Sequence, residues 1–339
     1  MNMKERNAAL IIFITLFMLT CTTLTLQHGT FQAVRHQERR YVILTVDDFG
    51  ASKSINAGVF RGLDAGLIKS VAAIVTFPDS IEEIKRLHQK YEEVEVGLHF
   101  CITSGYPVSG ADTVPTLVNE EGGFFPIDEL VPRIKDIDLE ELEKELRSQI
   151  EIVLDTGIPL ACLSSHHHIL NVYSPYFMIV LKLAGEYDLP VRSTMPVSVA
   201  FNSYSYAETR KWGKRLAVQA ISHDIFGCWY LKKYCTVEEM QKNQKQMDAE
   251  GIKHTDYLVD SFYGLATPQN LFHMLANLPE GSSEIVFHIG TFEKETKVPS
   301  GIEADYFFSR ECELFCVTSA EMERWLRLMN IQPINFADL

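Results

Sequence analysis

The stretch YVILTVDDFGASKSINAG, residues 41–58, joins an apolar run to two adjacent aspartates and then to a helix-like pattern. An unbroken run of β-favouring apolar residues is typical of a strand buried on both faces, as in a parallel sheet covered by helices. The run ends on Asp47 and Asp48, whose like charges repel each other and require a compensating positive charge nearby. The stretch therefore predicts a parallel α/β fold with a charged site at the end of its first strand.

The rest of the chain repeats this alternation of buried strands and helices. Further strands are expected at 71–77, 94–100, 161–165, 190–195 and 283–289. Helices are expected at 55–65, 81–91, 139–156, 175–187, 268–277 and 319–329. About six or seven such units would nearly close a (β/α) barrel, and an open doubly wound sheet is the alternative. In both folds the functional residues gather at the carboxyl ends of the strands.

Composition and charge limit the possible domain organisation and partners. The chain has 339 residues, of which 46% are hydrophobic, and this suits one large domain or one domain with an insertion. Its formal net charge of −14 argues against a nucleic-acid partner, because such a partner calls for a basic surface.

The first thirty residues differ from the remainder. Lys4 and Arg6 precede the apolar run ALIIFITLFMLTC, which is the anatomy of a signal peptide. We therefore expect residues 1–30 to be a signal peptide or a membrane anchor, and an anchor would associate the N-terminus with a membrane. The functional domain is expected at 40–330, outside the cytoplasm.

Ionisable residues end or follow the predicted strands, and they should meet at one rim of the fold. They are Asp47, Asp48, His99, His166, His167, His168, Arg192 and His288. Taken one at a time, a histidine is more often a hydrogen-bonded loop residue, and an aspartate pair can cap a helix. These separate explanations would have to hold for every one of these residues on the same rim. Such a coincidence is improbable, so the residues are expected to form one site.

The residue types indicate metal-dependent hydrolysis. Two imidazoles and a carboxylate from separate strands form a common site for one divalent cation, with positions left open for water and substrate. The cation would also compensate the aspartate pair. One aspartate would bind the metal, and the other would accept a proton from the water whose pKa the metal lowers. A histidine on the opposite rim, such as His288, could protonate the leaving group of an amide or ester.

The chain resembles the YdjC-like carbohydrate deacetylases, which include the chitooligosaccharide deacetylases. The matching elements are VDDFGASKSINAGV (46–59), GLIKSVAAIV (66–75), VGLHFCITSGYPV (96–108), SHHH (165–168), VR (191–192), EIVFHIG (284–290) and RECELFCVTS (310–319). The resemblance implies a distorted (β/α) barrel that removes N-acetyl groups from amino sugars in oligosaccharides. It implies Mg²⁺ as the metal, although two imidazoles would equally suit Zn²⁺.

The resemblance also implies roles for individual residues. It makes Asp48, His99 and His166 the metal ligands, and it makes Asp47 the base. Arg192 and His288 would line the substrate pocket, and we expect His168 to bind substrate as well.

The sequence departs from the family pattern at three positions. Ser164 stands where the family usually has Asp, Leu170 where it usually has His, and Ile289 where Pro is typical. These changes leave the expected metal ligands and base intact, but they bear on rate and substrate. Two alternatives therefore stay open: another metal-dependent ester or phosphoester hydrolase on the same site, and a catalytically weak carbohydrate-binding relative.

Two further segments are expected near the site. Residues 195–256 match the family least and form a variable insertion that is rich in aromatic residues and contains a helical stretch at 236–251. This insertion would stack on sugar rings or close over them, or else pack as an ordinary excursion with a homodimer contact. The long loop 103–137 is expected to border the pocket.

Overall fold

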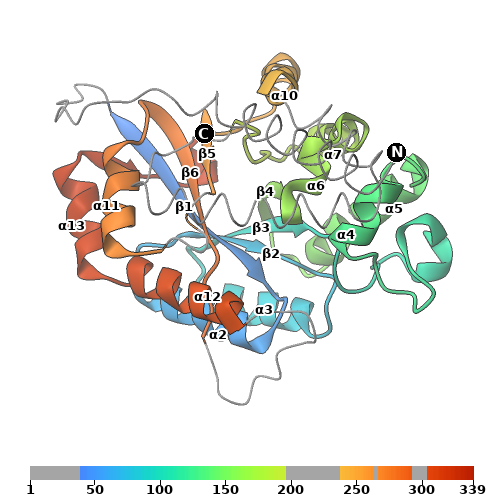
Figure 1. Ribbon diagram of the computed structural model, residues 1–339, viewed down its shortest axis with the longest axis horizontal. Coiled ribbons are helices and arrows are strands. Elements are labelled where there is room, and N and C mark those ends of the chain that lie inside the picture. Colours follow the sequence, from blue (N-terminus) through green and yellow to red (C-terminus); the bar gives the residue numbers. More distant parts are fainter. Residues whose placement is uncertain (1–38, 196–236, 261, 263–265, 292–303) are drawn as a thin grey trace, which may run out of the picture.

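The computed structural model describes residues 39–195, 237–260, 262, 266–291 and 304–339 (Figure 1). Within them, one parallel sheet has the strand order β4-β3-β2-β1-β6-β5, and β7 also pairs with β1. The strands are β1 (Arg40–Phe49), β2 (Ser70–Ala73), β3 (Glu95–Phe100), β4 (Leu160–Ser165), β5 (Tyr257–Val259), β6 (Gly281–Phe287) and β7 (Ile331–Pro333).

Helices surround this sheet in two groups (Figure 1). The group beside β1 and β6 contains α2 (Lys53–Asp64), α3 (Ser80–Lys90), α11 (Pro268–Ala276), α12 (Ala304–Val317) and α13 (Ala320–Leu328). The group beside β3 and β4 contains α4 (Ile127–Leu130), α5 (Leu139–Leu154), α6 (Ile169–Val172), α7 (Ser174–Tyr187) and α10 (Val237–Glu250). None of the helices in the described part of the chain is long and apolar enough to cross a membrane.

The sheet curls so that its two edges approach each other. Beyond β4, Val191 forms a parallel bridge with Leu163. On the other edge, the Leu258 N–H in β5 donates to the carbonyl of Met195, 2.8 Å away. The prediction of a distorted (β/α) barrel is therefore confirmed, in the form of a parallel sheet curled into a half-barrel.

Most predicted strands and helices are present, and the differences have simple causes. The strand expected at 190–195 is reduced to the single bridge at Val191, where Pro190 supplies no backbone N–H. The strands β5 and β7 were not predicted because each has only three residues. The expected N-terminal targeting segment and most of the expected insertion lie outside the described residues, so their roles stay predictions.

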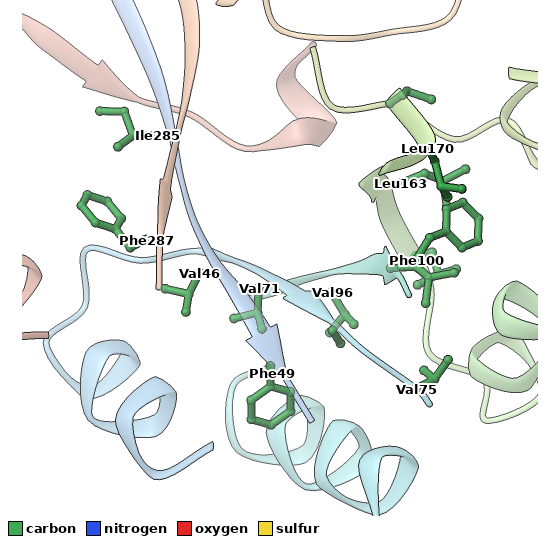
Figure 2. Packing of buried hydrophobic residues seen from close by; sticks show 14 of the residues in the cluster. Val46, Phe49, Val71, Val75, Val96, Phe100, Leu163, Leu170, Ile285 and Phe287 are labelled. Atoms are coloured by element: carbon green, nitrogen blue, oxygen red, sulfur yellow. The ribbon is translucent and has the colours of Figure 1, made fainter. Parts of the chain in front are cut away.

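Local sequence explains how the helices begin and what the sheet buries. Ser52 caps α2 by accepting a hydrogen bond from the Ile55 N–H. Asp138 caps α5 by accepting hydrogen bonds from the N–H groups of Glu140 and Glu141 in the first turn. Apolar side chains of β1 and β6, including Val46 and Phe287, pack in one continuous core between the sheet and its helices (Figure 2).

The long loop after β3 is fastened to α5 by a buried carboxylate. Glu145 accepts hydrogen bonds from the Val108 N–H at 3.0 Å and the Ser109 N–H at 2.9 Å, and also from the Ser109 hydroxyl at 2.6 Å. These bonds hold the beginning of the loop beside the carboxyl end of β3. The Thr103 hydroxyl is 3.0 Å from His167 Nδ1, so the loop reaches the strand-end histidines.

Candidate functional site

An irregularity in β1 lets both aspartates face the same site. Neighbouring residues of a regular strand point to opposite faces of the sheet. Here Val46 pairs with Val71 and Phe49 pairs with Ala73, so β1 has one more residue than β2 in this interval. Asp48 takes a left-handed conformation with φ of 68°. A bulge of this kind re-aims side chains, and both carboxylates end up only 2% exposed.

Asp47 is held by an arginine from the segment that follows β4. Arg192 Nη1 and Nη2 donate to the two oxygens of Asp47, each at 2.7 Å. The same guanidinium donates through Nη2 to Glu284 Oε1 at 2.8 Å. Burial would raise the pKa of Asp47, but Arg192 and His99 outweigh it and hold that pKa below its ordinary value. Arg192 is fully buried on these two carboxylates, and its expected contact with substrate stays a prediction.

Asp48 has a different arginine partner and one oxygen without a hydrogen bond. Arg310 Nη2 lies 2.5 Å from Asp48 Oδ2. Asp48 Oδ1 accepts no hydrogen bond in the described structure, although His166 Nδ1 is 3.0 Å away and His99 Nε2 is 3.6 Å away. Burial would raise the pKa of Asp48, but Arg310 and His166 hold it well below its ordinary value.

Arg192 and Arg310 supply positive charge that compensates the aspartate pair. The sequence-based interpretation assigned the compensating charge to a metal ion alone. In the structure, each aspartate has its own buried guanidinium, and that interpretation is incomplete. Arg310 belongs to RECELFCVTS, a family-matching element in which no residue is an expected ligand, base or substrate-binding group. Among the described residues, the three carboxylates of Asp47, Asp48 and Glu284 face two guanidinium groups.

His99 is fixed with one ring nitrogen aimed at the aspartates. Its Nδ1 is 2.7 Å from the Ser164 hydroxyl. Its Nε2 is 3.5 Å from Asp47 and 3.6 Å from Asp48. Burial lowers the pKa of His99 to about 3, so the ring is neutral, which is the form that ligates metals. Ser164, where the chain departs from the family pattern, therefore still supplies a hydrogen-bond partner for this histidine.

The three successive histidines have three different surroundings. His166 Nδ1 points at Asp48, and the ring of His167 lies against that of His166 with centroids 3.9 Å apart. His168 Nε2 is 2.7 Å from Asp260 Oδ2. Burial would lower the pKa of His168, but the bond to Asp260 raises it above the ordinary value, so the two form an ion pair. Asp260 was missed in the sequence because it follows the short strand β5.

His288 lies at the same rim, beyond the end of β6. Its Nε2 is 4.0 Å from Asp47 Oδ2, and its backbone N–H donates to Glu313 Oε2 at 2.7 Å. Burial lowers the pKa of His288, so the ring must take up a proton before it can donate one. Burial also raises the pKa of Glu313 to about 8, so that carboxyl is mostly protonated at neutral pH. The role of His288 as proton donor stays a prediction.

The other two departures from the family pattern lie in the core. Leu170 is fully buried and packs with Leu163 and Phe100 (Figure 2). Ile289 is also fully buried. Neither side chain supplies a polar group to the rim.

Three side chains have the arrangement of a metal site. Asp48, His99 and His166 each offer a ligand atom, and these atoms lie within 4.8 Å of one another. Asp48 Oδ1, which accepts no hydrogen bond from the described residues, and the neutral ring of His99 lie close together, and the carboxylates around them outnumber the guanidinium groups in the described part of the chain. These observations fit a divalent cation, which prefers such oxygen and imidazole donors.

Comparisons with known proteins bear on the family and the fold of the chain. A protein-family model described as YdjC-like protein matches residues 41–328. A carbohydrate deacetylase from Clostridium beijerinckii is 29% identical over 301 residues, covering 88% of this chain and 99% of the relative. One from Thermoanaerobacter pseudethanolicus is 24% identical over 304 residues, with the same two coverages. A solved structure of a proposed cellobiose-phosphate cleavage protein from Enterococcus faecalis V583 has a TM-score of 0.66 at 20% identity, covering 88% of this chain and 98% of that one. This last likeness bears on the fold alone.

Proposed function

The chain belongs to the YdjC-like family, and we propose that it is a metal-dependent deacetylase that removes N-acetyl groups from amino sugars in an oligosaccharide. The observation that carries the proposal is the set Asp48, His99 and His166, with Asp47 held beside it. The relatives named carbohydrate deacetylase support the substrate class.

The cation and the protein would divide the chemistry between them. A divalent cation held by Asp48, His99 and His166 would lower the pKa of a water and polarise the acetamide carbonyl. Asp47 would accept the proton. Its two bonds to Arg192 fix the plane of the carboxylate, and each oxygen keeps a further lone pair for the incoming proton. Arg192 would therefore act by orienting the base.

The metal is proposed to be Zn²⁺ or Mg²⁺. Two imidazoles and one carboxylate oxygen suit Zn²⁺, whereas the family resemblance implies Mg²⁺. Metal analysis of the purified protein would decide between them. Loss of activity on chelation, followed by recovery with one ion and not the other, would give the same answer independently.

The test of the function separates the two aspartates. Asp48→Asn should lower metal content and turnover together, because Asp48 supplies a ligand. Asp47→Asn should keep the metal but lower turnover by about 10²–10⁴-fold, because it removes the proton acceptor. Acetate release from a panel of N-acetylated oligosaccharides measures turnover, and metal analysis measures occupancy. The exposed Asp155→Asn serves as the matched control.

Three results would contradict the proposal in different ways. If the parent protein releases no acetate from any N-acetylated sugar, the substrate class is wrong. If Asp47→Asn empties the site while Asp48→Asn keeps it filled, the two roles are reversed. If both variants keep full activity, the aspartate pair is structural.

A further inference from the structure

Helix α12 brings two residues to the back of the metal site. Arg310 and Glu313 lie one turn apart on this helix, so their side chains leave it on the same face. Arg310 is 2% exposed and contacts Asp48, whereas Glu313 is fully buried and accepts the backbone N–H of His288. The helix therefore touches two strand ends of the site at once.

Two glycines allow a close approach between α2, the backbone after β6 and Arg310. A Cβ on Gly58 in α2 would lie 2.4 Å from the Cα of Gly290. A Cβ on Gly290 would lie 3.3 Å from both Cβ and Cδ of Arg310. A larger residue at Gly58 would therefore push against the Gly290 backbone, and a larger residue at Gly290 would press on the stem of Arg310. At this close approach the buried guanidinium of Arg310 lies directly against one oxygen of Asp48.

We propose that Arg310 is the resident countercharge of Asp48: it occupies Oδ2 whether or not a cation is bound, and it leaves only Oδ1 to ligate the metal. The contacts divide the carboxylate in this way, because Oδ2 meets the guanidinium at 2.5 Å and Oδ1 meets the two histidines. The effect of Arg310 on metal binding rests on the proposed function, which supplies the metal. The pairing of Arg310 with Asp48 is independent of that function.

The arrangement has two physical consequences. Without metal, Arg310 neutralises Asp48, so the buried aspartate pair does not disrupt the folded state. With metal, the guanidinium repels the cation and prevents Asp48 from donating through both oxygens. Arg310 thus stabilises the metal-free site and weakens the hold on the cation, which leaves that cation more electron-poor. Arg310 acts through Asp48 and is a positioning residue.

The experiment uses the whole protein and two substitutions at one position. Arg310→Met removes the charge and keeps most of the length, whereas Arg310→Lys keeps the charge. Arg327→Met is the matched control, because Arg327 lies exposed on α13 and pairs with the exposed Glu323 one turn away. Melting temperature is measured without metal and with Zn²⁺ or Mg²⁺, and metal Kd is measured by titration calorimetry.

If Arg310 is a countercharge, removing its charge should destabilise the metal-free protein and strengthen metal binding. Arg310→Met should melt lower than the parent without metal, should gain more from added metal, and should bind metal about tenfold more tightly. Arg310→Lys should stay near the parent Kd, and Arg327→Met should change neither quantity. A merely structural arginine would give unchanged or weaker metal binding, and that result in a folded variant overturns the proposal. If Arg310→Met does not fold, a weakened Kd in Arg310→Lys overturns it.

The metal-free protein separates this inference from the proposed function. If the parent binds neither ion, the metal dependence proposed above fails. The countercharge is then decided by a double-mutant cycle between Asp48→Asn and Arg310→Met, with metal-free stability as the readout. Clear coupling between the two substitutions supports the pairing, and additive effects overturn it.

Discussion

Replacing Glu313 by glutamine should stabilise the protein, and the gain should grow with pH. Glu313 is fully buried, and burial raises its pKa to about 8. The unfolded chain ionises this group near its ordinary value of about 4.3. Between these two values the folded state holds a proton that the unfolded state has lost, so stability falls as pH rises from about 4.3 to 8. Glutamine has no such proton to lose, and its oxygen can accept the same His288 N–H.

The size of the effect follows from the separation of the two pKa values. Each pH unit in this window is worth about 1.4 kcal/mol of unfolding free energy. The substitution should therefore add about 1 kcal/mol at pH 5 and about 4 kcal/mol at pH 7, with little further gain above pH 8. Denaturant unfolding of metal-free protein at pH 5, 6 and 7 measures these differences. The exposed Glu120→Gln, in the loop after β3, is the control and should show none. A difference from the parent that is the same at all three pH values would refute a protonated, buried Glu313.

Three other substitutions test the packing and the surroundings of the site. Gly58→Ala should cost about 1–3 kcal/mol, because its Cβ would lie 2.4 Å from the backbone that follows β6; Gly185→Ala, with open space around it, should cost nothing, and equal melting temperatures for the two would contradict the close approach. Asp260→Asn should lower the pKa of His168, as measured by NMR titration, because it removes the ion pair at 2.7 Å. An unchanged pKa of His168 would show that Asp260 does not pair with it in solution. Glu145→Gln should speed proteolysis of the loop after β3 by leaving a backbone donor unpaired, and a parental cleavage rate would show that other contacts hold the loop.

The strand ends show what could be predicted from the sequence. Apolar runs identify buried strands by themselves, because a parallel sheet covered on both faces needs apolar side chains at consecutive positions. Once the strands are parallel, their carboxyl ends share one rim, so residues that follow them in sequence must approach each other. For this reason the grouping of Asp48, His99 and His166 was already predicted from the chain, and the structure places their ligand atoms within 4.8 Å. A strand as short as β5 has too few apolar residues to be recognised in the sequence. Asp260, which follows β5, was therefore not predicted as a site residue.

Only the tertiary structure decided how the charges of the site are paired. Arg192 and Arg310 lie 145 and 262 residues away from the aspartates that they hold, and no local pattern links positions so far apart. Whether a guanidinium meets a carboxylate depends on the packing of α12, the glycine contact at Gly58 and the bulge in β1. A charge buried in a protein interior needs a partner at a defined distance. That distance is set by how the elements pack around β1. The residue types at the rim could therefore be predicted from the sequence. The pairing of each aspartate with its arginine is determined only by the tertiary structure.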